Sequence, residues 1–197
     1  MNVPADPISR FISLLDQAKA LPRDQLPEPT AFGLATASSE GAPSLRIVLL
    51  KGVDERGFVF YTNLQSRKGR ELAQNRRVAL CFHWAQLEMQ VRVEGAAEAV
   101  TDGEADAYFA SRDRGSQVGA WASTQSATLA ERRDLEARVA EYERRFEGRP
   151  VPRPPHWSGF RVPPERIEFW KNRASRLHDR HVYTRRADGW RVTMLYP

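Results

Sequence analysis

The sequence predicts an α+β fold built on a β-barrel or strongly curled sheet with mostly antiparallel strands. Five segments rich in Val, Ile, Phe and Thr follow one another closely between residues 30 and 100, with turn-forming residues between them. Strands this close along the chain pair antiparallel, because a parallel crossover needs about a dozen residues or more. Helical patterns flank this region and strand-like segments return near the C-terminus, which gives the α+β class.

Capping signals and apolar spacing predict the helices. Asp6-Pro7 is a typical helix start, and apolar residues at helical spacing follow to about residue 20. Ser66 is a candidate cap for a short helix to about residue 75. Thr101 and Glu104 form a capping-box pattern that opens a helix through residue 111. A charged helix with one apolar stripe is predicted over residues 129–146.

The strands are predicted from β-branched and aromatic runs bounded by turn residues. In chain order they cover 30–38, 45–53, 57–62, 77–85, 88–100, 159–162 and 166–170, followed by a hairpin of 181–185 and 190–195. We expect one domain over 1–197. Its parts are an N-terminal helix and connector (1–29), main barrel strands (30–100), helices (101–147) and C-terminal strands (156–197).

The composition indicates a cytoplasmic protein. No apolar run approaches the roughly 18 residues that span a bilayer, and the N-terminal MNVPADPISRF lacks a basic region followed by an apolar one. We therefore expect neither a membrane span nor a secretory signal. The single cysteine, Cys81, forms no internal disulfide, in agreement with a reducing compartment.

The basic residues favour anionic ligands. The formal net charge is +5, and only four of the thirty basic residues are lysines. Arginine presents a planar fork that matches phosphates and carboxylates, although an arginine-rich solvated surface explains the same composition. No basic block and no nucleic-acid motif is present, so we expect no nucleic-acid partner. Histidines at metal-ligand spacing, a dinucleotide fingerprint and a P-loop are also absent from the sequence.

Three groups of residues are candidate anion sites. Arg67 and Lys68 directly follow the candidate cap Ser66, where free backbone N–H groups favour a phosphate; a solvent-facing pair is the alternative. Tyr108, Arg112 and Ser116 are spaced by four and share one face if the helix continues past Gly115; an incidental spacing is the alternative.

The third group is Arg176-Leu177-His178-Asp179-Arg180. In a strand, Arg176, His178 and Arg180 would point to one face and Leu177 into the packing. Three cationic or protonatable groups side by side repel one another unless they surround an anion, so this segment indicates a binding site. The alternative is a structural strand whose charges pair with Asp179 and its neighbours.

At these residues the sequence resembles the pyridoxine/pyridoxamine 5′-phosphate oxidase family. The matching segments, in family order, are RIVLLK at 46–51, FYTNL at 60–64 with SRK at 66–68, EMQ at 88–90, GAW at 119–121 with QS at 125–126, and IEFW at 167–170 with RLHDR at 176–180. Residues 1–7, MNVPADP, lack the arginine- and tyrosine-containing N-terminal segment that the family often carries. The resemblance implies an FMN-binding split β-barrel that works as a homodimer, with two flavin sites at the subunit interface.

The resemblance also implies the site residues. FMN contacts fall on Arg46, Ile47, Val48, Leu49, Leu50, Lys51, Tyr61, Thr62, Arg67, Lys68, Gln90, Gln125, Ser126, Trp170 and Arg180, some of them from the partner chain. Substrate contacts fall on Lys51, Tyr108, Arg112, Ser116, Arg176 and His178. Arg176 and His178, beside the pyridine ring, are the expected catalytic residues, and no metal is implied.

The implied reaction is the oxidation of pyridoxamine 5′-phosphate, pyridoxine 5′-phosphate or both to pyridoxal 5′-phosphate. The flavin takes a hydride equivalent from the C4′ carbon, and O2 reoxidises it and yields H2O2. Two alternatives remain: a related FMN oxidase that acts on phenazine-type precursors, and a flavin- or pyridoxal-phosphate-binding protein with little turnover.

Overall fold

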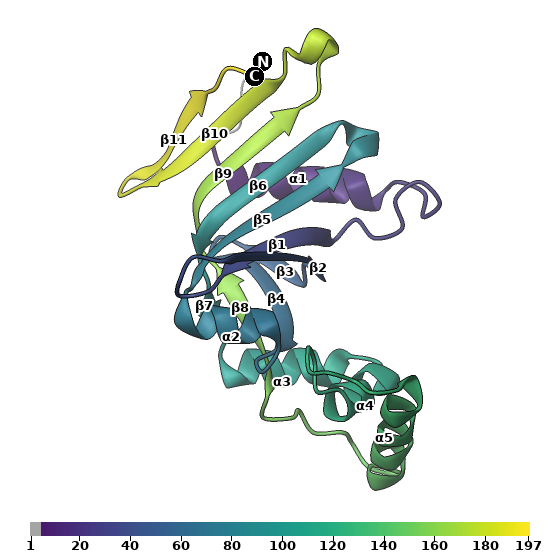
Figure 1. Cartoon of the computed structure of the whole chain (residues 1–197). Helices are drawn as coiled ribbons and strands as arrows, with labels where there is room; N and C mark the ends of the chain where they lie inside the picture. Colours follow the sequence, from purple (N-terminus) through teal and green to yellow (C-terminus); the bar gives the residue numbers. More distant parts are fainter. Residues whose placement is uncertain (1–4) are drawn as a thin grey trace.

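The computed structural model describes residues 5–197, which combine helices and antiparallel sheets, so the predicted α+β class is confirmed (Figure 1). The expectations that rest on residues 1–4 lie outside the described residues. The helices are α1 (Pro7–Lys19), α2 (Arg67–Gln74), α3 (Asp102–Ser111), α4 (Arg114–Ala122) and α5 (Arg132–Arg145), with short 3-10 turns η1 (Ala85–Leu87) and η2 (Ala174–Arg176). None of the helices within residues 5–197 is long and apolar enough to cross a membrane.

The larger sheet has seven strands in the order β11-β10-β9-β6-β5-β1-β2, and every neighbouring pair is antiparallel. The strands are β1 (Ala31–Ala37), β2 (Pro43–Leu49), β5 (Arg77–Trp84), β6 (Met89–Ala96), β9 (Pro164–Lys171), β10 (Asp179–Arg186) and β11 (Gly189–Met194). The hairpin predicted at the C-terminus is therefore confirmed as β10 and β11.

The smaller sheet has the order β3-β4-β8-β7 and is also antiparallel. Its strands are β3 (Gly52–Asp54), β4 (Gly57–Asn63), β7 (Glu98–Ala99) and β8 (Trp157–Val162). The chain passes between the sheets without a long loop at three places: β2 to β3, β6 to β7, and β8 to β9. At the first crossing, the N–H of Leu50 bonds to Thr30 beside the large sheet, and that of Lys51 bonds to Val59 in the small one.

These crossings correct two sequence predictions. The strand predicted over 45–53 is two strands in different sheets, β2 and β3, and the strand predicted over 88–100 is likewise β6 and β7. The apolar run continues through each crossing because both sheets bury their inner faces in the same core. The periodicity therefore shows no break.

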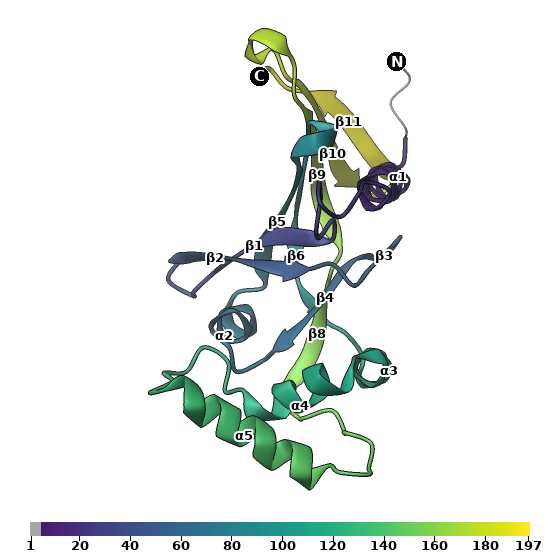
Figure 2. The same cartoon turned by 90° about the vertical axis from the view of Figure 1, so that its right-hand side faces the viewer.

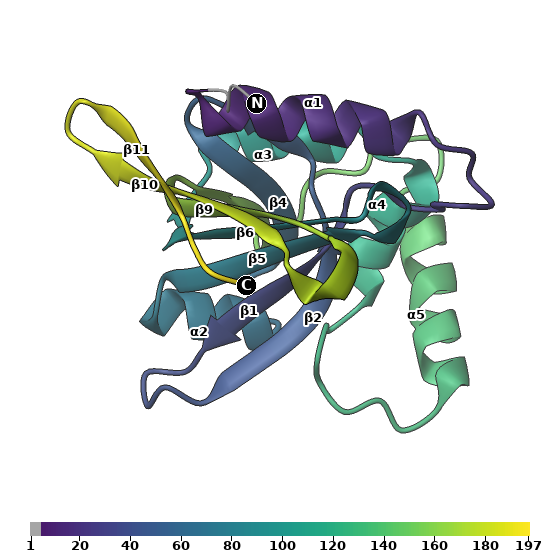
Figure 3. The ribbon, with the colours of Figure 1, turned by 90° about the horizontal axis from the view of Figure 1, so that it is seen from above.

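An aromatic cluster fills the space between the sheets and α1. Phe11 of α1 is fully buried, and its ring contacts Phe58 of the small sheet and Phe82 of the large sheet, each at a centroid distance of 4.8 Å. Figure 3 shows α1 running along one side of the sheets. Rings of this size dominate core energetics, so this cluster ties the N-terminal helix to both sheets at once.

Helices α3, α4 and α5 gather at one end of the molecule, beyond β4 and β8, and the turn η2 lies at the opposite end (Figures 1 and 2). Thr101 caps α3 with the predicted capping box. Helix α4 was not predicted as an element of its own: its sequence, RGSQVGAWA, is poor in strong helix formers, but Asp113 caps it by accepting from the Ser116 N–H at 2.8 Å. The helix predicted over 129–146 begins three residues later, at Arg132.

Gly69 gives a test of how tightly α2 is docked. A Cβ at this position would lie 2.2 Å from the Leu64 carbonyl oxygen, so Gly69→Ala should destabilise the chain by about 1–3 kcal/mol through overpacking. Gly103, in the first turn of α3, is the matched control, because its Cβ would meet nothing within 4 Å. Gly103→Ala should stabilise by about 0.5–1 kcal/mol. Urea unfolding of both variants measures these changes in the free energy of unfolding. Equal changes in the two variants would contradict the close packing of Gly69 against Leu64.

Candidate functional site

A cleft of about 460 Å³ opens between the β2–β3 crossing, strand β4 and helices α2, α3 and α4. It lies where the three-helix end of the molecule meets the two sheets. The structure brings many of the sequence-predicted residues together here: Ile47, Val48, Leu49, Lys51, Tyr61, Thr62, Lys68, Tyr108, Arg112, Ser116 and Gln125 all line it. The cleft thus joins two of the predicted anion sites, which are 40 residues apart in the sequence.

Lys68 supplies a buried charge at one end of the cleft. Only 9% of the residue is exposed, and its Nζ donates to Thr62 Oγ1 at 3.1 Å and to Gln125 Oε1 at 3.3 Å. Burial, and then the charge of Arg46, lowers the pKa of Lys68. A cation held among neutral acceptors next to another cation is an electrostatic arrangement that a bound anion stabilises.

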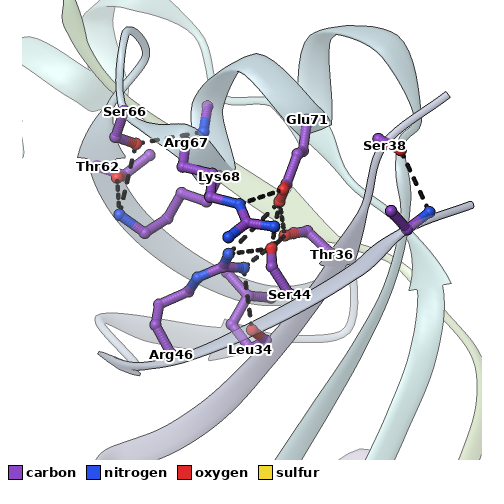
Figure 4. Close-up of polar contacts among 12 residues, drawn as sticks. Leu34, Thr36, Ser38, Ser44, Arg46, Thr62, Ser66, Arg67, Lys68 and Glu71 are labelled. Carbon is purple, nitrogen blue, oxygen red and sulfur yellow. Dashed lines mark hydrogen bonds and ion pairs between the residues drawn. The ribbon is translucent and has the colours of Figure 1, made fainter. Parts of the chain in front are cut away.

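Next to Lys68, two arginines converge on one buried carboxylate, Glu71 (Figure 4). Arg67 Nε donates to Glu71 Oε1 at 2.9 Å, and Arg46 approaches Oε2 at 3.4 Å. Burial raises the pKa of Glu71, but hydrogen bonds from Ser44, Thr36 and Arg67, with the charge of Arg67, outweigh it and lower the pKa to about 2. Glu71 is therefore ionised at neutral pH. Glu71 was not among the predicted site residues, although its position four residues after Arg67 on a helix was a usable signal.

Arg112 supplies a second, half-buried charge to the cleft. Its guanidinium carbon lies 4.9 Å from the centre of the Trp157 ring, and burial lowers the pKa of Arg112. Among the described residues, the buried Nη1 has no hydrogen-bond partner. A buried guanidinium N–H without an acceptor is costly, so Arg112 is a candidate hydrogen-bond donor to a ligand in the cleft.

Arg112 belongs to a group that differs from the predicted geometry. The helix does not continue from Tyr108 to Ser116: α3 ends at Ser111, Arg112 is extended, and α4 begins after Asp113. The break therefore lies at Arg112 and Asp113 and not at Gly115. The three residues still line one cleft, because the turn between α3 and α4 keeps both helices beside it.

Stacked rings support this side of the cleft. Tyr61 stacks on Tyr108 with ring centroids 4.1 Å apart, and Tyr61 is parallel to Trp157 at 5.3 Å. Gly159 makes room for Tyr61, since a Cβ there would lie 2.6 Å from its ring. Trp157, which the sequence analysis did not single out, fixes the positions of both Arg112 and Tyr61.

The other predicted residues form a separate cluster. Gln90, Trp170 and Arg180 occupy one row across β6, β9 and β10, and the His178 ring lies 4.3 Å from that of Trp170. Arg180 Nε donates to the buried Glu168 at 2.8 Å. This cluster lies toward the end of the large sheet that carries η2, far from α3 and α4 (Figures 1 and 2). Within residues 5–197, one chain therefore does not bring all the predicted residues together.

The strand predicted through residues 176–180 is wrong in its first half. Strand β10 begins at Asp179, and Arg176 ends the turn η2 with a φ of +61°. Arg176, His178 and Arg180 consequently do not share a strand face. Leu177 is 68% exposed and does not point into packing. Asp179 pairs with Arg173 at 2.6 Å. This arginine lies outside the segment 176–180, so the charge pattern of that segment did not predict the pair.

The remaining predicted residues flank these groups. Leu50 is buried in the core at the sheet crossing, and Arg46 and Arg67 lie beside Lys68, which lines the cleft (Figure 4). Ser126 is exposed, with a φ of +71°, in the segment between α4 and α5.

Comparison with known families identifies this arrangement. Residues 19–146 match a family model described as pyridoxamine 5′-phosphate oxidase, and residues 157–197 match one described as the pyridoxine 5′-phosphate oxidase C-terminal dimerisation region. The chain belongs to the pyridoxine/pyridoxamine 5′-phosphate oxidase family. The resemblance found in the short motifs is thereby confirmed over nearly the whole chain.

Relatives of this oxidase family match over almost the whole of this chain. A pyridoxine/pyridoxamine 5′-phosphate oxidase of Myxococcus xanthus (strain DK1622) is 62% identical over 99% of this chain and 93% of its own length. One of Rubrobacter xylanophilus is 59% identical over 98% of this chain and 87% of its own length.

Solved structures confirm the split-barrel fold of the family. PhzG from Burkholderia lata 383, in complex with tetrahydrophenazine-1-carboxylic acid, superposes with a TM-score of 0.89 at 34% identity, covering 100% of this chain and 95% of that one. A pyridoxamine 5′-phosphate oxidase-related, FMN binding protein from Nostoc punctiforme PCC 73102 has a TM-score of 0.76 at 16% identity and full coverage of both chains, which indicates the shared fold alone.

Proposed function

We propose that this chain is an FMN-dependent oxidase that converts pyridoxamine 5′-phosphate, pyridoxine 5′-phosphate or both to pyridoxal 5′-phosphate, with O2 as the electron acceptor and H2O2 as the second product. One observation carries the proposal: a single cleft is lined by two separate cations, the buried Lys68 at its α2 end and the half-buried Arg112 at its α3 end. Two such ends suit two phosphate groups, one on the cofactor and one on the substrate.

The residues at the Lys68 end fit the phosphate of FMN. Arg46, Arg67 and Lys68 together carry three positive charges against the one negative charge of Glu71 (Figure 4). A phosphate monoester carries a charge of about −1.5 to −2 at neutral pH, which nearly balances the net positive charge of these four side chains. The backbone and side chains of 46–51, with Tyr61, Thr62 and Gln125, would then hold the rest of the cofactor along the cleft.

The residues at the Arg112 end fit the substrate phosphate. The unpaired Nη1 of Arg112 needs an acceptor, and the hydroxyls of Tyr108 and Ser116 line the same cleft. Phosphate oxygens accept hydrogen bonds from both groups. Lys51, between the two ends, would contact both ligands.

FMN, when bound, supplies the two-electron acceptor that protein side chains lack. The protein's own contribution is alignment and electrostatics. Arg112, Tyr108 and Ser116 fix the substrate by its phosphate, so that its C4′ carbon meets the cofactor in one orientation. Lys51, which lines the cleft apart from the Arg46, Arg67 and Lys68 group, would stabilise negative charge on the cofactor ring. Arg176 and His178 would lie beside the substrate ring.

The second cluster would reach the cleft from a partner chain. Gln90, Trp170, Arg176, His178 and Arg180 are remote from the cleft of their own chain, and the family model that covers most of them describes a dimerisation region. Leu45 and Ile47, on the edge strand β2 beside the cleft, are 71% and 68% exposed. Apolar side chains on an edge strand are a typical contact for a second copy. A homodimer with two sites at its interface follows.

A phenazine-type substrate is the second candidate, and the structural similarity to PhzG favours it. The identity to that protein is 34%, whereas the relatives named for the vitamin B6 phosphates reach 59–62%.

The proposed function has a direct test. The purified full-length chain should be yellow, bind about one FMN per chain, and release H2O2 with pyridoxamine or pyridoxine 5′-phosphate, because each cleft has one end suited to a flavin phosphate. A visible spectrum and a peroxide assay measure both. A colourless protein that gains no flavin spectrum on titration with FMN would refute the proposal, and turnover of phenazine precursors alone would favour the second candidate.

Arg112→Ala should weaken the binding of phosphorylated substrate roughly 10- to 150-fold while FMN content stays unchanged. The reason is that one charge-assisted contact is worth about 1.5–3 kcal/mol. Steady-state KM and the flavin-to-protein absorbance ratio measure the two effects. Arg132→Ala, which removes an exposed arginine of α5, is the control and should change neither. Equal losses of FMN and substrate affinity in Arg112→Ala would contradict the assignment of the two ends.

Subunit complementation tests the shared site. A mixed dimer of one Arg112→Ala chain and one Arg180→Ala chain, isolated by two different affinity tags, should regain roughly half of the wild-type peroxide activity. One of its two sites then has both arginines intact. Each variant alone should be impaired. If both arginines served a site within one chain, the mixed dimer would contain no intact site, and its activity would stay at the level of the single variants.

A further inference from the structure

The Glu71 carboxylate is buried beside the cationic end of the cleft, yet no role in the proposed reaction calls for a negative charge there. The residue is 7% exposed and lies on α2, one turn after Arg67. Simple electrostatics makes its position unexpected, since a carboxylate next to an anion site repels the anion. Its hydrogen bonds provide the explanation.

Glu71 is the common acceptor of a converging network (Figure 4). Its Oε2 accepts from the hydroxyls of Thr36 and Ser44, each at 2.5 Å, and lies 3.4 Å from Arg46 Nη2. Its Oε1 accepts from Arg67 Nε at 2.9 Å. One side chain thus joins two strands and a helix, and it fixes an arginine on each of two elements.

The direction of these hydrogen bonds depends on a carboxylate. Thr36 and Ser44 each donate their only hydroxyl proton to Glu71, and each then accepts from the Arg46 guanidinium. Arg46 also donates to the Leu34 carbonyl at 3.2 Å. An ionised carboxylate has acceptors only, so it orients both hydroxyls toward itself and leaves their lone pairs for Arg46. A glutamine amide would turn an N–H donor toward either Arg67 or the Arg46 side, and one arginine would lose its acceptor.

We propose that Glu71 is a positioning residue for the cofactor phosphate: it holds Arg46 and Arg67 in place so that, with Lys68, they form a preorganised cradle for a phosphate monoester. This inference rests on the proposed function, because it takes FMN as the ligand at this end of the cleft. The low pKa of about 2 keeps Glu71 ionised, and the network intact, at every pH at which the chain is expected to work. The affinity gained by fixing two long side chains before binding outweighs the repulsion from one carboxylate.

The decisive experiment compares FMN with riboflavin, which has the same ring and ribityl chain but no phosphate. Full-length wild-type and Glu71→Gln chains, freed of flavin, are titrated with each ligand by fluorescence quenching. We expect Glu71→Gln to weaken FMN binding roughly tenfold or more and to leave riboflavin binding within about twofold, since only the phosphate contacts lose their geometry.

The competing explanations give different results. If Glu71 only lowers the local positive charge, Glu71→Gln should bind FMN more tightly than wild type, and the proposal is overturned. If Glu71 is only a structural residue, FMN and riboflavin affinities should fall together with the melting temperature, which also overturns it. Unchanged FMN binding overturns it as well. Absence of FMN binding in the wild-type chain would instead refute the proposed function itself, so the two failures are distinguishable.

Two further variants serve as controls. Glu136→Gln removes another carboxylate that pairs with an arginine four residues before it, Arg132 at 3.2 Å, but on α5 away from the cleft, and it should leave both affinities unchanged. Ser44→Ala removes one relay hydroxyl while Glu71 stays in place. It should reproduce the FMN-selective loss more mildly, and it keeps the proposal testable if Glu71→Gln does not fold. Equal loss of FMN and riboflavin in Ser44→Ala would overturn the proposal.

Discussion

The burial of one aromatic core between two antiparallel sheets is the constraint on which the rest of this structure depends. Phe11 contacts a ring from each sheet, so neither sheet nor α1 buries its apolar face without the other two. To close around this core, the chain must cross from one sheet to the other, and the first crossing brings Leu49 and Lys51 to the cleft. After this crossing the chain forms β4 and α2, and residues of both elements line the cleft together with residues of α3 and α4. The site is therefore a consequence of how the core is closed.

A second feature of the structure is that buried carboxylates hold clusters of arginine side chains. Two buried carboxylates each gather arginines: Glu71 holds Arg46 and Arg67, and Glu168 accepts from Arg92, Arg166 and Arg180. For both, burial raises the pKa, while hydrogen bonds from their partners outweigh it and lower the pKa. Arginine clusters without such an acceptor would repel one another and lose their order. In the proposed dimer, the Glu168 cluster of one chain and the Glu71 cluster of the other would serve the same cofactor, one at each side.

Much of the architecture could be predicted from local signals. Caps at Asp6, Ser66 and Thr101 gave three helices, and the alternation of β-branched residues gave most strands. The prediction failed where the deciding interaction is not local. Sheet changes after Leu49 and Ala96 leave no mark in an apolar run, and α4 depends on a cap and on packing more than on helix propensity. In the segment 176–180, charge alternation predicted a strand, but backbone torsions at Ser175 and Arg176 turn the chain before β10 begins.

By itself, the sequence determined the fold class, the family and the identities of the candidate site residues, because these depend on residue types and on short spacings along the chain. Only the tertiary structure decided which of those residues meet. It placed Lys68 and Arg112 in one cleft and set Trp170 and Arg180 apart from them at the other end of the sheet. It also brought in Glu71 and Trp157, whose importance lies in contacts with Arg46 and Arg112 that are distant in the chain. Such contacts arise from sheet closure and ring stacking, and no pattern of neighbouring residues encodes them.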